Sequence, residues 1–208
     1  MSLDLDDLPA HELGSEAVHR CISFADIDLS GRSAESVEFT QCRFKDVDVS
    51  GTTLGRAVFT DCFVGNSNLA NLRAEKSSLV RVELSVLRMT GLHWTDGLLR
   101  DVRFTESRLD ISSFRFTDFV RVLFEQCNLT GADFIKADLC GAQFIGCDLT
   151  GAQFSQANME GARFSHCVLA GIGGVTSWKG AIVRSHDLVT LSHTLAAALG
   201  IRIEGEEN

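Results

Sequence analysis

The sequence predicts an all-β fold, a four-sided (quadrilateral) β-helix with a short N-terminal cap and a C-terminal α-helix. The first observation is a five-residue repeat that runs through most of the 208 residues. The second is the spacing of glycines, which recur in one column at intervals of 20 residues. The third is composition, since the chain holds 14 phenylalanines and no tyrosine. Rings without hydroxyl groups are typical of a dry interior, where a Tyr O–H would need a hydrogen-bond partner.

The repeat is clearest over residues 127–151, which read CNLTG ADFIK ADLCG AQFIG CDLTG. We call the Leu or Phe position the centre of each pentad. Every fifth residue from 24 to 169 gives 30 centres, and 28 of them hold Leu, Phe, Val, Met or Trp, the exceptions being Ala34 and Ala74. Twelve of the 14 phenylalanines lie in this register. The repeat is therefore organised around the burial of these rings.

The position two residues before each centre holds small or modest residues such as Ala132, Ala142 and Cys147. Two inward residues in five fit neither the helical period of 3.6 nor the strand period of 2 alone. They fit a chain that turns a corner after every pentad, so that four pentads make a square coil of 20 residues. One column of corners holds glycine or asparagine, for which positive φ is cheap: Gly31, Gly51, Asn71, Gly91, Gly131, Gly151 and Gly171. We expect about 7.5 coils and, at roughly 4.8 Å per coil, a column about 36 Å long.

These signals divide the chain into three parts. Residues 1–21 are predicted to form an N-terminal cap, with Pro9 near the start of a short helix that covers the open edge of the first coil. Residues 22–172 are predicted to form the β-helix. Residues 173–208 are predicted to form an irregular turn and then a helix over 186–199, which Ser185 caps and Gly200 closes.

The predicted C-terminal helix carries an apolar stripe at helical spacing, formed by Leu188, Leu191, Leu195 and Leu199, and Ile201 follows it. One stripe is enough to cap the last coil. The breadth of the apolar surface leaves a second possibility open, in which these residues also form the interface of a homodimer.

Charge and hydropathy argue against several classes of protein. The net charge of -9 opposes general nucleic-acid binding, because phosphate binding rests on Lys and Arg. No apolar run approaches the roughly 20 residues that a membrane helix needs. The acidic start from Met1 to Asp7 lacks the features of a signal peptide. Seven cysteines, an odd number with no CxxC pair, favour a reduced, cytoplasmic setting.

No motif for catalysis, cofactor binding or metal binding stands out. Five cysteines occupy the small inward position: Cys42, Cys62, Cys127, Cys147 and Cys167. Inert packing is favoured over a metal site there, because no His or carboxylate enters their columns. Ser185, His186 and Asp187 are triad residue types, but neighbours in sequence cannot adopt the relay geometry. We therefore expect a protein without catalytic residues, cofactor or metal.

Pentads such as Ala132-Asp-Phe-Ile-Lys and Ala137-Asp-Leu-Cys-Gly fit the pattern A(D/N)LXX, and by them residues 22–172 resemble the pentapeptide-repeat family. The resemblance implies a right-handed β-helix, the pentapeptide-repeat solenoid. The ending from Leu191 to Ile203 resembles the C-terminal helix of the Qnr-like and MfpA-like members. Those members are dimers joined through that end. They mimic B-DNA, bind type II topoisomerases such as DNA gyrase or topoisomerase IV, and give antibiotic resistance by protecting against gyrase poisons. The unbroken register leaves no room for projecting loops, so the chain resembles the loopless MfpA-like rods.

Charge offers a test of DNA mimicry. Residues 22–172 carry 19 Asp and Glu against 15 Lys and Arg, a net charge of −4. A duplex of the same length would carry about 21 negative charges, at one per roughly 1.7 Å. Mimicry therefore requires a local patch, and the candidate residues are Asp26, Asp28, Asp46 and Asp48.

The central coils show the reverse balance, because nine Lys and Arg residues between 73 and 121 outnumber seven acids. Arg88 and Arg108 stand in the same column as Asp28 and Asp48, and Phe116 and Leu123 are apolar residues in outward positions nearby. Two functional hypotheses follow. One is a DNA mimic that binds a topoisomerase, and the other is a scaffold that binds another protein through the central coils. An ordinary solvated surface of mixed charge is the alternative to both.

Overall fold

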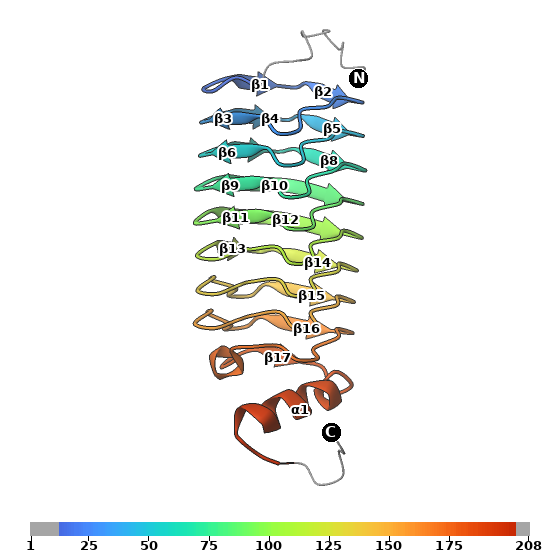
Figure 1. Cartoon of the computed structure of the whole chain (residues 1–208), viewed down its shortest axis with the longest axis vertical. Helices are drawn as coiled ribbons and strands as arrows, with labels where there is room; N and C mark the ends of the chain where they lie inside the picture. The colour runs from blue at the N-terminus through green and yellow to red at the C-terminus, as the bar shows by residue number, and fades with distance from the viewer. Residues whose placement is uncertain (1–12, 203–208) are drawn as a thin grey trace.

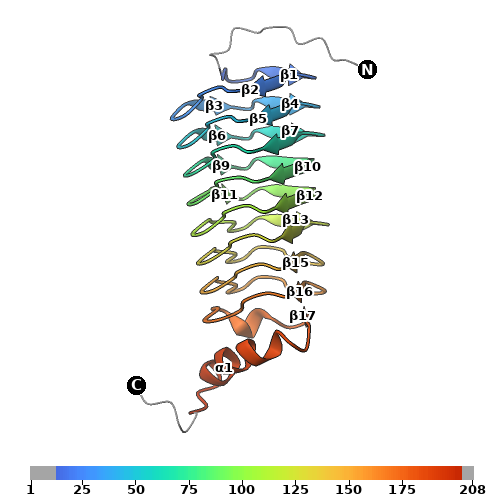
Figure 2. The same cartoon turned by 90° about the vertical axis from the view of Figure 1, so that its right-hand side faces the viewer.

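The computed structural model describes residues 13–202, which form a rod of stacked coils with a helix at the C-terminal end (Figure 1). The rod is the right-handed β-helix that the sequence predicted, with about eight turns. Its strands are parallel, and they pair residue i with residue i + 20, as in Phe24 with Phe44 and Phe124 with Phe144, except for the last pair, in which Phe164 meets Val183 at i + 19. This register confirms the 20-residue coil. The view turned by 90° shows the coils stacked in line, with the helix beyond the last of them (Figure 2).

Most strands are three residues long because the chain turns a corner after each pentad. The strands are β1 Val18–Arg20, β2 Ser23–Ala25, β3 Ser33–Glu35, β4 Glu38–Thr40, β5 Arg43–Lys45, β6 Thr53–Gly55, β7 Val58–Thr60, β8 Phe63–Gly65, β9 Arg73–Glu75, β10 Ser78–Ser85, β11 His93–Thr95, β12 Leu98–Thr105, β13 Asp118–Val120, β14 Leu123–Glu125, β15 Gln143–Ile145, β16 Arg163–Ser165 and β17 Ile182–Val183. A 3-10 turn, η1, covers Val175–Ser177, and helix α1 covers Leu188–Ala198. Only β10 and β12 continue around a corner within the described residues.

We name the four sides of the rod by their inward centres. Face A has the centres 24, 44 and so on to 164, face B those from 29 to 169, face C those from 34 to 154, and face D those from 39 to 159. Faces A and D share a 13-stranded sheet, and β3, β6, β9 and β11 form a second sheet on face C. Face B is joined by isolated bridges, such as Asp28 with Asp48. Coils are numbered from coil 1 (residues 22–41) to coil 8 (residues 162–181).

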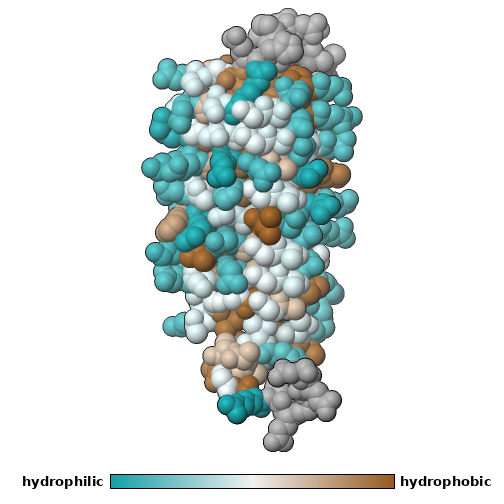
Figure 3. Space-filling model, viewed as in Figure 1, coloured by the Kyte–Doolittle hydropathy of each residue, from teal (hydrophilic) through white to brown (hydrophobic). Residues whose placement is uncertain are grey.

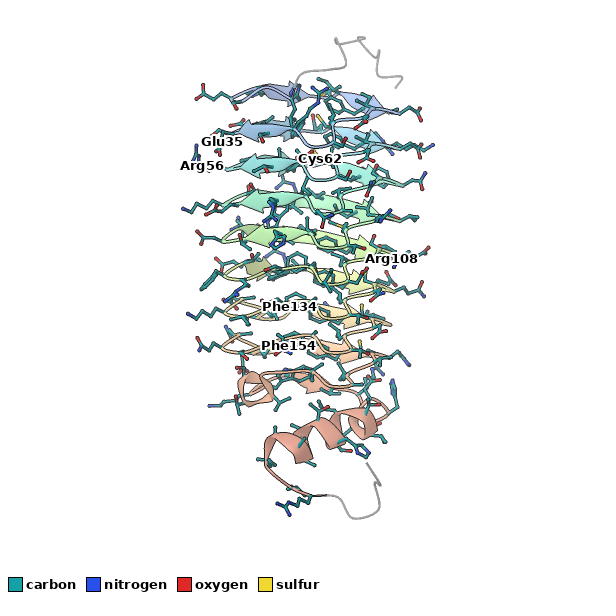
Figure 4. The ribbon with its side chains drawn as sticks, in the orientation of Figure 1. Glu35, Arg56, Cys62, Arg108, Phe134 and Phe154 are labelled. Atoms are coloured by element: carbon teal, nitrogen blue, oxygen red, sulfur yellow. The ribbon has the colours of Figure 1, made fainter. Side chains whose placement is uncertain are left out.

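Ladders of stacked aromatic rings form a large part of the core. On face A, Phe124 stacks on Phe144 with ring centroids 5.0 Å apart, and Phe144 stacks on Phe164 at 4.8 Å. Figure 4 labels two members of the ladder on face C, Phe134 and Phe154, whose centroids are 5.2 Å apart. These ladders confirm the predicted columns of phenylalanine. The N-terminal half is packed less closely, and an apolar cavity of about 70 Å³ runs inside it.

The corners depart from the prediction in one respect. Glycine spacing predicted positive φ in a single column, but the structure has positive φ at every fifth residue from Glu16 to Gly171. All four corners therefore use the same left-handed turn. The prediction was too narrow because polar side chains occupy most of the other corners, and glycine is frequent in only one column.

Both ends of the solenoid extend beyond the predicted boundaries. Strand β1 at residues 18–20 pairs with β4, so the solenoid begins before coil 1, and β17 pairs with β16 after residue 172. The helix predicted near Pro9 lies outside the described residues. Helix α1 begins at Leu188, two residues later than predicted, and the residue before it is Asp187 rather than Ser185. Gly200 follows the helix with a φ of +72°, as the prediction required.

The apolar stripe of α1 is divided between the core and the surface. Leu191 is buried and Leu195 is half-buried against the core, so these two residues pack as a capping helix would require. Leu188, Leu199 and Ile201 are 50%, 76% and 57% exposed. Capping therefore accounts for only part of the stripe.

Candidate protein-binding surface

The corner between faces A and B gathers six of the eight residues that the sequence analysis selected for partner binding. Bridges in one column join Asp28 to Asp48, Asp48 to Asn68, Asn68 to Arg88, and Arg88 to Arg108. Asp26 and Asp46 lie two residues earlier, on the corner itself. We call the following set the charged edge: Asp26, Asp28, Asp46, Asp48, Arg88 and Arg108. It is negative in coils 1 and 2, neutral at Asn68, and positive in coils 4 and 5.

Hydrogen bonds to the backbone hold the acidic half of the charged edge in place. The Ser30 N–H donates to Oδ1 of Asp28 at 2.8 Å, and the Ser50 N–H donates to Oδ1 of Asp48 at 2.8 Å. These are Asx turns, in which a short side chain bonds the backbone two residues on. Nδ2 of Asn68 donates to the second oxygen of Asp48 at 2.9 Å. Asp28 and Asp48 thus have a structural role in their corners as well as a charge.

The same bonds stabilise the ionised form of both carboxylates. Hydrogen bonds from the side chain and backbone of Ser30 lower the pKa of Asp28 below its ordinary value. Partial burial acts to raise the pKa of Asp48, but hydrogen bonds from Ser50 and Asn68 and the charge of Arg88 outweigh it, so that this pKa is also lowered. Negative charge is therefore fixed on two adjacent coils.

The central coils are less strongly charged than the sequence indicated, because ion pairs neutralise several of their arginines. Arg81 and Arg121 each bind an aspartate in the preceding coil, Asp61 and Asp101, through two hydrogen bonds of 2.5–2.9 Å. Nε of Arg108 lies 3.7 Å from Oδ1 of its neighbour Asp110. Such exposed pairs contribute little to stability but cancel the net charge.

Phe116 does not join the charged edge, contrary to the expectation that it shares a central patch with Arg88 and Arg108. It occupies the corner between faces C and D, in the column of Arg56. Figure 4 shows Arg56 and Arg108 on opposite sides of the rod. Leu123 lies on β14 of face A, next to Arg103 of β12. A quarter turn every five residues separates side chains that are close in sequence.

Two exposed apolar residues occupy corners where the sequence pattern predicted no functional residue. Val86 and Ile111 have φ values of +55° and +51°, and their side chains are 51% and 64% exposed. A β-branched residue at positive φ is an outlier. The five-residue register places both residues at corners, and this is the signal in the sequence that identifies them; the predicted corner column, however, was based on glycine and asparagine. Apolar patches stand among polar ones in the middle of the face shown in Figure 3.

The interior thiols are buried, as predicted. Sγ of Cys147 and Sγ of Cys167 donate to the carbonyls of Phe124 and Phe144, each at 3.4 Å. Hydrogen bonding with Cys127, together with burial, raises the pKa of Cys147 to about 12. Cys140 is exposed. Within residues 13–202, no group of three or more His, Cys, Asp or Glu side chains is arranged to hold a metal ion.

The C-terminal end holds the other surface feature. An open groove separates α1 from the last coil and is lined by Ile172, Val175, His193 and Ala197, among others. In the described part of the chain, no helix has the length and apolar character needed to cross a membrane.

Comparisons with known proteins cover nearly the whole solenoid. The family model described as pentapeptide repeats matches residues 108–144, 127–165 and 147–171, and the model described as a pentapeptide repeat region matches residues 19–114. A trypsin-treated variant of QnrB1, a plasmid-mediated fluoroquinolone resistance protein, is 21% identical over 95% of this chain and 96% of its own, with a TM-score of 0.41. HetL from the cyanobacterium Nostoc, a pentapeptide repeat protein involved in heterocyst differentiation regulation, is 16% identical over 84% of this chain and 87% of its own, with a TM-score of 0.49. No curated protein sequence matches the chain.

Proposed function

This chain belongs to the pentapeptide-repeat family, and on that premise we propose that it is a non-catalytic protein-binding module. The observation that carries the proposal is the charged edge, where carboxylates held by backbone hydrogen bonds remain ionised on adjacent coils. A solenoid buries two residues of each pentad, so the outward residues are free to match a partner. Preorganised side chains lose little entropy when a partner binds.

The partner we propose is a type II topoisomerase, DNA gyrase or topoisomerase IV. The acidic half would occupy part of its cationic DNA-binding surface as a local DNA mimic and so protect it against gyrase poisons. Carboxylates on successive coils are about 4.8 Å apart along the rod, against about 3.4 Å between phosphates of one DNA strand. The arginines of coils 4 and 5 would repel a cationic surface, so the mimicry is confined to coils 1 and 2.

Supercoiling by gyrase, measured with and without a poison across a titration of this protein, tests the proposal. The double variant Asp28→Asn/Asp48→Asn removes charge and keeps the Asx turns, because Asn128 makes the same bond to the Thr130 N–H in this column. We expect it to lose the effect on gyrase. The matched control is Asp148→Asn, which removes one carboxylate from the same column and turn in coil 7. No effect of the wild-type protein at micromolar concentration would refute the proposal.

A second candidate function is a scaffold that binds an acidic protein through the basic half of the charged edge. The exposed, strained Val86 beside Arg88 favours it, because an apolar residue at such a corner adds nothing to the stability of the isolated chain. Leu123 on face A would extend the contact. The double variant Arg88→Glu/Arg108→Glu should abolish capture of such a partner and leave the gyrase assay unchanged. A loss of the gyrase effect instead would assign the arginines to the first function.

We further propose that α1 joins two copies of the chain end to end. Leu188, Leu199 and Ile201 form an exposed apolar surface that capping leaves unused. The variant Leu199→Glu should convert dimers to monomers in sedimentation equilibrium, and Thr190→Glu, which adds the same charge to α1, is the control. Monomeric wild-type protein at all concentrations would contradict this proposal.

A further inference from the structure

Two exposed apolar residues bracket face C in coil 5. Ile111 and Phe116 lie at successive corners, with φ values of +51° and +57°. Their side chains are 64% and 48% exposed. Ile111 interrupts a corner column that holds glycine or asparagine in all of the other coils. Backbone strain and exposure both oppose the stability of the isolated chain, which points to a contact outside it.

Two opposite charges stand at equal distances from Phe116 in its corner column. Asp96 is one coil before it and Lys136 is one coil after it, as the backbone bonds from Asp96 N to Arg115 O and from Phe116 N to Ile135 O establish. Both charged residues are exposed. Lys136 lies over the Phe116 ring, with Nζ 5.2 Å from its centroid. Neither Asp96 nor Lys136 forms an ion pair with another described residue.

This order of negative, aromatic and positive is self-complementary. Two antiparallel rods can pack through face C about a two-fold axis that lies in the interface, perpendicular to both rods, at the level of coil 5. This axis places coil 4 of one rod against coil 6 of the other. Asp96 then meets Lys136 of the second copy, and Phe116 meets Phe116. We propose that face C is a self-association surface on which a second copy of this chain docks antiparallel.

The other positions of face C agree with this arrangement. His93 in coil 4 faces Asp133 of the second copy, and the bridges from His93 to Ser113 and from Ser113 to Asp133 confirm that they are equally spaced. Arg73 and Lys76 in coil 3 face uncharged residues of coil 7. Arg115 meets its own copy on the axis, but Asp133 of its own chain lies 3.7 Å away and offsets that charge. A parallel two-fold arrangement would instead exchange the two edges of face C and place Asp96 against Gly91 and Lys136 against Gly131, so that neither charge would meet an opposite one. An isologous interface needs this kind of self-matching pattern.

The size of the face sets the expected strength. An axis at coil 5 pairs coils 2–8, and seven coils at about 4.8 Å with a side of about three strand residues give a contact of roughly 34 by 10 Å. Both copies together would bury about 700 Å², below the roughly 1,200 Å² of standard stable interfaces. We therefore expect a weak dimer that forms at tens to hundreds of micromolar, in contrast to the end-to-end contact through α1.

Charge reversal tests the inference, with sedimentation velocity across a concentration series as the readout. The background is Leu199→Glu, so that the proposed contact through α1 does not contribute. Asp96→Lys and Lys136→Asp should each weaken association about tenfold or more, because each reversal occurs twice in the dimer and places like charges together. The double variant should restore association to near the starting value, because the antiparallel pairs are then reversed but complementary.

Phe116→Asp should abolish association without unfolding the chain, because Asp26, Asp46 and Asp61 already occupy corners with positive φ. Lys76→Glu, which reverses a charge facing uncharged residues, is the matched control and should change association little. Restoration by the double variant supports the antiparallel dimer. Failure of the double variant to restore association, or monomeric behaviour of the background protein at several hundred micromolar, overturns the inference.

Discussion

Replacing Gly151 by alanine tests whether backbone conformation or space determines the residue at a corner. Gly151 has a φ of +71°, and no atom lies within 4 Å of the position that a Cβ would occupy. Steric contact therefore contributes nothing, and the left-handed backbone conformation alone costs an L-residue about 1–2 kcal/mol. Alanine recovers about 0.4–1 kcal/mol by restricting the unfolded chain. We expect Gly151→Ala to lower the free energy of unfolding by about 1 kcal/mol.

Urea denaturation followed by circular dichroism measures this difference, and a thermal scan should show a midpoint lower by about 2–4 °C. Gly151→Asn is the control. Asn71 stands in the same column with a φ of +56°, so asparagine should be tolerated better than alanine. If alanine is neutral, or if asparagine destabilises the chain as much as alanine does, the corners are not governed by left-handed strain.

Three other changes probe different parts of the rod. Trp94→Phe should alter the free energy of unfolding, measured in urea, by less than about 1 kcal/mol. The buried Nε1 of Trp94 has no hydrogen-bond partner among the described residues, so removing this unsatisfied donor (about 1–3 kcal/mol) offsets the lost packing. A loss of about 3 kcal/mol would contradict this prediction. Asp61→Asn should flatten the acid destabilisation that circular dichroism detects below about pH 4. The hydrogen bond from Arg81 lowers the folded-state pKa of Asp61, so the contribution of Asp61 to stability is present above the unfolded pKa of about 3.9 and is lost as the pH falls through the folded value. An unchanged slope would count against this prediction. Asp187→Ala should destabilise the docking of α1 by about 1.5–3 kcal/mol and speed the amide hydrogen exchange of the helix. The reason is that the buried Asp187 carboxylate accepts a hydrogen bond from the His166 N–H at 2.9 Å. Unaltered exchange would show that this bond does not hold the helix.

The repeat register could be derived from the sequence alone because the interior of a solenoid is nearly one-dimensional. Each pentad contacts mainly the coils before and after it, so the same position must satisfy the same environment throughout. Phe124, Phe144 and Phe164 could therefore be assigned to one ladder without any coordinates. The column shared by Asp28, Asp48, Arg88 and Arg108 followed from the same arithmetic.

The ends were harder to predict because they break the repeat. The start of α1 depends on Asp187, whose carboxylate bonds the backbone of His166 in the preceding coil and does not cap the helix. Local sequence favoured Ser185, a good capping residue. The hydrogen bond between Asp187 and His166, which are 21 residues apart, holds the chain at Asp187, and the helix begins at the next residue.

What the sequence determined by itself is which residues face inward and which residues share a column, because both depend only on periods of 5 and 20. Only the tertiary structure decided which outward side chains bond to one another and which stay exposed. It paired Arg81 with Asp61 through two hydrogen bonds and left Ile111 and Phe116 exposed in left-handed corners. The physical reason is that outward side chains have no packing constraint to impose a pattern. The period of 20 fixes their column, but their ion pairs and exposure depend on the conformation of each side chain.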